Sequence, residues 1–154
     1  MLPHEIIASL GLFLAGIGLI YTGRQIQQAR KIARGEFLLH LDELFAQHND
    51  VHLLLRPGGD YANGGKKPDT TQEWTVVERY MGLFERVKAL IDDKIIDIDT
   101  VYSFYGYRVF NLTANETIRE CKLVQEEESW IDFVELWRAL EAYRKRAVAK
   151  KVCI

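Results

Sequence analysis

The stretch that decides the fold is residues 6–23, which reads IIASLGLFLAGIGLIYTG. It contains no charged side chain and is bounded by Glu5 and Arg24. A helix rises about 1.5 Å per residue, so a run of this length nearly crosses a bilayer core of about 30 Å. A cleaved signal peptide and a buried core helix are the alternatives, but the N-terminus MLPHE lacks the basic residues of a signal peptide. We therefore expect a retained transmembrane anchor.

The charges that follow the run predict its orientation. No acid lies in residues 24–34, and no Lys or Arg precedes the run. The basic residues of this collar are Arg24, Arg30, Lys31 and Arg34. Basic residues stay on the cytoplasmic side, and they also contact anionic lipid head groups. The sequence thus predicts a single span in the bacterial inner membrane, with the N-terminus outside and the C-terminal domain in the cytoplasm.

This orientation divides the chain into a transmembrane anchor with its basic collar, residues 1–34, and a cytosolic helical domain, residues 35–154. The cytosol is a reducing compartment, so Cys121 and Cys153 are expected to be free thiols. The helical domain holds 16 basic and 21 acidic residues, a net charge of −5. That balance argues against binding long nucleic acid, which requires a basic surface.

Small residues mark one face of the apolar run. They recur at steps of three and four, at Ala8, Gly11, Ala15, Gly18 and Thr22. Such a stripe lets helices approach closely in lipid and predicts a homo-oligomer, although small residues are also simply common in membrane helices. Apolar residues keep the same spacing from Ile26 to Leu55, which predicts one helix to about Leu55 with Gly35 as its weak point.

The rest of the chain reads as further helices. Arg56-Pro57-Gly58-Gly59 ends the first helix, and a loop without apolar period follows over residues 58–70. Capping boxes are predicted at Thr70 with Glu73 and at Ser129 with Asp132. The predicted helices run to about Asp92, from Asp97 to about Thr113, over a short segment at 115–124, and from Ser129 onward. Alternation of period two is limited to four residues, so the fold class is all-α.

The sequence presents no catalytic motif, and we expect neither an enzyme nor a cofactor. His48 and His52 lie one helical turn apart, but no third metal ligand is evident and His48 falls on the apolar seam, so we expect no metal site. Arginine and tyrosine give a more specific hypothesis, because a guanidinium binds phosphate through paired hydrogen bonds and an aromatic ring stacks on a base. The candidate ligand-binding residues are Arg79, Arg86, Tyr105, Arg108 and Arg119. The alternative is that these arginines pair with nearby acids such as Glu78, Glu85 and Glu120.

Four stretches carry a resemblance to a known family. They are Gly35-Glu36-Phe37-Leu38-Leu39, LLLRPGG at 53–59, VERYMGLFE at 77–85 and Tyr105-Gly106-Tyr107-Arg108. Together they resemble small bacterial proteins filed as a domain of unknown function of the 4760 type. The resemblance implies an N-terminal span followed by a helical cytosolic domain, and no reaction. The layout is also similar to membrane effectors of antiviral defence, including those of type III CRISPR systems, in which a small domain senses a nucleotide messenger.

These observations lead to one functional hypothesis and one alternative. The first is an oligomeric, membrane-anchored effector that senses a ligand such as a nucleotide and perturbs the membrane. Its partners are the lipid bilayer, further copies of itself and a small anionic nucleotide. The alternative is a membrane-tethered scaffold that binds another protein without ligand gating.

Overall fold

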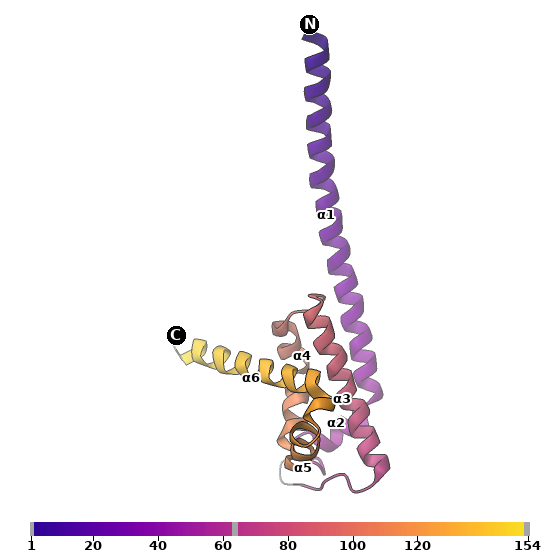
Figure 1. Ribbon diagram of the computed structural model, residues 1–154, viewed down its shortest axis with the longest axis vertical. Helices are drawn as coiled ribbons and strands as arrows, with labels where there is room; N and C mark the ends of the chain where they lie inside the picture. The colour runs from indigo at the N-terminus through magenta and orange to yellow at the C-terminus, as the bar shows by residue number, and fades with distance from the viewer. Residues whose placement is uncertain (1, 63–64, 153–154) are drawn as a thin grey trace. The chain divides into compact units, whose positions relative to one another are not determined.

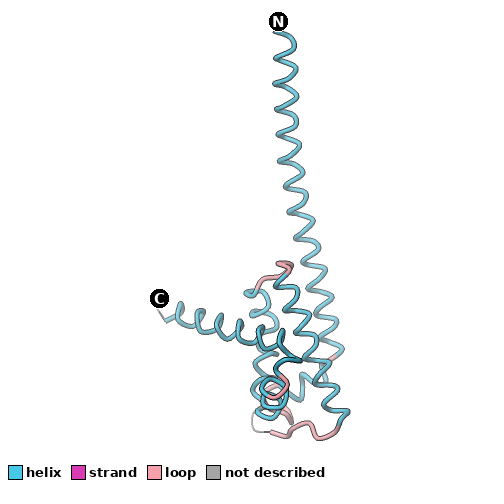
Figure 2. Tube along the Cα trace, in the orientation of Figure 1, coloured by secondary structure: helices cyan, strands magenta, loops and turns pink. Residues whose placement is uncertain are grey.

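A computed structural model describes residues 2–62 and 65–152, with the side chains of 2–15, 30 and 150–152 outside the description. Throughout the described residues the backbone is helix, turn or loop, and none of it is strand (Figure 2). The all-α prediction is confirmed. The chain divides into two compact units, Met1–Leu41 and Asp42–Ile154. The sequence had placed its boundary at residue 35.

Helix α1 (Leu2–Gln47) begins in the first unit and contains the whole apolar run. Three residues of the small stripe, Ala8, Gly11 and Ala15, lie in the part of α1 whose side chains are outside the description. Gly18 and Thr22 are exposed, and the Thr22 hydroxyl donates to the Gly18 carbonyl at 2.9 Å. Within the described residues, no helix combines the length and the apolar character needed to cross a membrane.

The predicted continuous helix to Leu55 is wrong from His48 onward. Helix α1 ends at Gln47, and a separate helix α2 (Asn49–Leu55) follows. His48 leaves the helical region (φ −111°, ψ 27°), and its N–H reaches back three residues to the Phe45 carbonyl at 3.2 Å. The predicted apolar seam is confirmed in part, because Leu41, Val51 and Leu55 are buried while Ile26 is 49% exposed. The seam passed through Leu44 and His48, which are half-buried, and missed the buried Phe45.

The turn after α2 depends on its two glycines. Gly58 has φ +86°, a conformation that side chains disfavour. A Cβ at Gly59 would lie 2.3 Å from the Leu53 carbonyl oxygen, so this close approach excludes a side chain. The predicted helix end at residues 56–59 is confirmed.

The remaining elements complete the second unit. They are α3 (Thr71–Asp92), α4 (Ile98–Ala114), α5 (Glu116–Ile118), the π-helical η1 (Arg119–Val124), the 3₁₀-helical η2 (Glu127–Trp130) and α6 (Ile131–Val152). Helix α6 packs against α3 and α4 (Figure 1). Aromatic rings fill the space between the helices: the Phe45 centroid lies 5.0 Å from Phe84 and 4.8 Å from Tyr105, and Phe84 contacts Phe133 at 5.8 Å. Such pairs add to the stabilisation that burial supplies.

Side-chain caps set where two of these helices begin. Thr70 Oγ1 accepts from the Glu73 N–H at 3.2 Å, and Glu73 Oε2 accepts from the Thr70 N–H at 2.9 Å. Asp97 Oδ1 accepts from the Thr100 N–H at 2.7 Å. The predicted cap at Ser129 is wrong, because Ser129 lies inside η2 and its N–H donates to the Glu126 carbonyl. The 3₁₀ turn carries the chain into α6 in its place.

Candidate functional site

The structure brings together two of the five predicted ligand-binding residues. Tyr105 and Arg108 lie one turn apart on α4, and both contact the Phe45 ring. Arg79 and Arg86 are exposed on α3. Arg119 is half-buried in η1, where its guanidinium donates to the Thr113 carbonyl at 3.3 Å.

Arg108 is the centre of a polar and aromatic cluster in the second unit. Its Nε donates to the Tyr107 hydroxyl at 3.0 Å, and a terminal nitrogen donates to the Tyr80 hydroxyl at 3.3 Å. The guanidinium carbon lies 5.3 Å from the Phe45 ring centroid, within range of a cation–π contact. The ring of His52, on α2, meets Tyr107 edge-on at 5.4 Å. We call Tyr80, Tyr105, Tyr107, Arg108 and His52 the Arg108 cluster.

Three neighbours of Arg108 in this cluster, Tyr80, Tyr105 and His52, are electrically neutral near pH 7. Burial raises the pKa of Tyr80, and burial together with the Asp42 carboxylate raises the pKa of Tyr105. Burial lowers the pKa of His52 below its ordinary 6.5, and Arg108 and Arg56 lower it further. The Tyr80 and Tyr105 phenols therefore keep their protons, and the His52 imidazole stays uncharged.

No carboxylate among the described residues forms an ion pair with Arg108. The nearest acid in the cluster's hydrogen bonds is Asp42, which is exposed and accepts from the Tyr105 hydroxyl at 2.7 Å. A guanidinium has five N–H donors, and its described bonds to Tyr107 and Tyr80 use two. Because Arg108 is only half-buried, the remaining donors can bind an anion from solvent.

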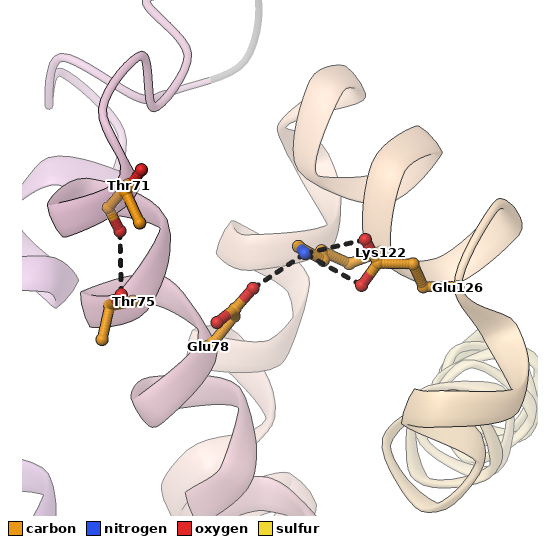
Figure 3. A network of polar contacts seen from close by, with 5 residues as sticks. All are labelled: Thr71, Thr75, Glu78, Lys122 and Glu126. Carbon is orange, nitrogen blue, oxygen red and sulfur yellow. Dashed lines mark hydrogen bonds and ion pairs between the residues drawn. The ribbon is translucent and has the colours of Figure 1, made fainter.

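A second charged centre lies on the opposite side of α3, where η1 meets it. Lys122 is 8% exposed, and its ammonium lies 2.8 Å from Glu78 Oε1 and 2.9 Å from Glu126 Oε1 (Figure 3). It also stands 5.1 Å from the Trp74 ring centroid. Burial alone would lower the pKa of Lys122, but its hydrogen bonds to Glu126 and Glu78 raise it. The positive charge of Lys122 is thus paired within the chain. These ion pairs tie η1 to α3, and they leave Lys122 with little capacity to bind an anionic ligand.

The two histidines considered as metal ligands serve different contacts. The His48 ring lies 6.2 Å from Tyr80, whereas His52 contacts Tyr107. Across the part of the chain that the structure describes, no group of three or more His, Cys, Asp or Glu residues is arranged to hold a metal ion. Cys121 is a half-buried free thiol, and Cys153 lies outside the described residues.

Comparisons with known proteins give no relative for this arrangement. No protein-family model matches the chain, and neither a curated protein nor a solved structure does. The resemblance to the family of unknown function and to defence effectors stays a prediction.

Sequence reasoning missed three residues that organise the second unit. Lys122 was overlooked because nothing in the sequence shows that it is buried, although Glu126 four residues on is a weak sign of pairing. Asn115 is buried and donates to the Tyr61 and Lys66 carbonyls, which fixes the backbone at these two residues. Tyr80 was read as neither core nor site, yet it is fully buried beside Arg108.

Proposed function

We propose that this chain is a membrane-anchored, self-associating effector whose helical unit senses a small anionic ligand, such as a nucleotide messenger. The observation that carries the proposal is the state of Arg108. Its cation is half-buried among neutral groups and has no carboxylate ion pair among the described residues. A buried or half-buried charge without an opposite charge is costly, and an anion removes that cost.

The membrane part of the proposal rests on residues 6–23 and the basic collar behind them. In this arrangement the helical unit lies in the cytoplasm beneath the inner membrane, where a messenger reaches it. Self-association rests on the small-residue stripe of the same run. Ligand binding changes the packing of the helical unit and, through α1, the association of the spans. The outcome is a perturbed membrane, as in antiviral defence.

The ligand is tested with the full chain purified from bacterial cells and analysed by mass spectrometry for co-purified nucleotides. Arg108→Lys keeps the charge but loses the planar fork, so we expect at least a tenfold fall in bound ligand. Arg146→Lys is the matched control, because Arg146 is an exposed arginine outside the cluster. Equal occupancy in the two variants, or none in the native chain, refutes ligand sensing at Arg108.

The effector step is tested in the same cells by growth and membrane potential. The native chain should depolarise the membrane when the ligand is present, and Arg108→Lys should not. A chain that starts at Phe37 lacks the apolar run and should also be inert. A native chain that neither slows growth nor changes the potential under any condition contradicts the effector proposal.

One observation favours the scaffold alternative. Phe104 and Tyr107 lie one turn apart on α4 and are 60% and 49% exposed. Exposed aromatic residues are enriched at protein interfaces. A scaffold predicts that Phe104→Ser abolishes capture of a partner protein while Arg108→Lys leaves it unchanged.

A further inference from the structure

A small cavity opens between α2 and the first turns of α3, away from the Arg108 cluster. Its volume is about 160 Å³. The lining residues are Asp50, Val51, Leu54, Tyr61, Gln72, Glu73, Val76 and Val77. Val51 and Val77 are each 1% exposed, and Tyr61, which follows α2, lines the cavity as well. The cavity thus lies wholly within the second unit.

The interior of the cavity is apolar and close in size to a single aromatic ring. Its surface is mostly apolar, and four of its eight lining residues are valines or leucines from two helices. An enclosed apolar cavity of about 150 Å³ binds benzene in a well-studied case, so a cavity of this volume has room for one aromatic ring. A ligand that places one ring here exchanges contact with water for dispersion contacts with the apolar walls.

The rim of the cavity carries two carboxylates in different states. Glu73 Oε2 is occupied by the Asp69 N–H at 2.8 Å and the Thr70 N–H at 2.9 Å, so this group serves the α3 cap. Asp50 is exposed in the first turn of α2, and the described residues offer it no ion-pair partner. A ligand cation that stands at the mouth therefore meets an unmatched negative charge.

We propose that this cavity binds a small aromatic amine, with its ring among Val51, Leu54 and Val76 and its ammonium group at Asp50. The apolar walls supply most of the affinity, and the carboxylate selects a cation over a neutral or anionic ligand of the same size. This site does not depend on ligand sensing at Arg108, because the two sites share no residue.

The probes are benzylamine, benzyl alcohol and benzoate, which share one ring and differ in charge. Binding to the full chain is followed by ligand-observed NMR in one detergent throughout, with protein-free micelles as the blank. We expect benzylamine to bind most tightly, benzyl alcohol more weakly and benzoate weakest. Asp50→Asn should weaken benzylamine roughly two- to fivefold, the range of an exposed ion pair, and leave benzyl alcohol unchanged.

The cavity itself is tested by filling it. Val76→Phe should lower benzylamine binding at least tenfold, and Leu54→Phe is a second filling variant from the other wall. Val124→Phe is the matched control, because Val124 is exposed and outside the cavity. Circular dichroism and thermal melting identify which variants keep the native fold. Benzylamine binding that survives in a folded filling variant, or is absent from the native chain, overturns the proposal, and equal effects of Asp50→Asn on all three probes overturn the role of Asp50.

Discussion

His52 is a member of the Arg108 cluster whose charge state depends on burial and on the neighbouring arginines. Its Nδ1 atom is buried, and no described atom forms a hydrogen bond with it. The adjoining charges, Arg108 and Arg56, are both positive. Burial and like charge therefore act in the same direction, and both disfavour the imidazolium.

This arrangement predicts a loss of stability in mild acid. The pKa of His52 lies below its ordinary 6.5 in the folded chain. At a pH between the folded-state pKa and the unfolded-state pKa of about 6.5, the unfolded chain therefore binds more protons than the folded chain. Stability contributed by the neutral imidazole is present above about pH 6.5 and is lost as the pH falls. Urea unfolding at pH 7.5 and 5.5 should show a smaller pH dependence in His52→Gln than in the native chain. His40→Gln is the control, because His40 is exposed in the other unit. An unchanged pH dependence in His52→Gln contradicts the assignment.

At the scale of elements, the buried ammonium of Lys122 holds η1 in place, and the sequence alone does not predict its burial. A π-helical turn is uncommon, and this one places Lys122 toward Glu78 of α3. Glu126, four residues after Lys122, forms a second ion pair with the same ammonium group. Hydrogen bonds to charged groups contribute about 1.5–3 kcal/mol each when buried. The two glutamates are 38% and 47% exposed, so water screens part of this contribution.

We expect Lys122→Met to lower the free energy of unfolding by about 1–3 kcal/mol, because it leaves two carboxylates facing each other without a cation. Equilibrium urea unfolding measures the change. Lys145→Met is the control, since Lys145 is exposed on α6. A double-mutant cycle with Glu78→Gln isolates the contact between η1 and α3. A coupling energy near zero means that η1 is held by its apolar residues alone.

How far the sequence predicts these elements depends on the range of the signal. The Thr70 and Asp97 caps act within three residues, so their oxygen and N–H groups could be paired from spacing alone. The break at His48 and the 3₁₀ turn around Ser129 could not be predicted from such local spacing, because both depend on how later helices pack. Two of the five residues of the Arg108 cluster were predicted, Tyr105 and Arg108, because they lie one turn apart on one helix. Tyr80 and His52 could not be predicted, because they lie on other helices.

At the scale of the whole molecule, the proposed association between copies of the chain rests on the first unit. Gly18 is exposed, and a Cβ built there meets no described atom within 4 Å. A larger side chain at this position therefore has room within its own chain. Any loss of association in such a variant must come from a contact between chains, which is where a small residue matters.

We expect Gly18→Leu to weaken self-association of the full chain at least tenfold in a mild detergent, because a leucine holds two helix backbones apart. Light scattering coupled to size-exclusion chromatography measures the distribution of oligomers over a dilution series. Ile20→Phe is the matched control: Ile20 is 64% exposed and lies on the opposite face of α1 at 100° per residue. If the stripe is the interface, the two variants differ and depolarisation in cells falls with Gly18→Leu alone. If both variants associate like the native chain, the contact between copies lies elsewhere, and the small residues of the run reflect helix composition.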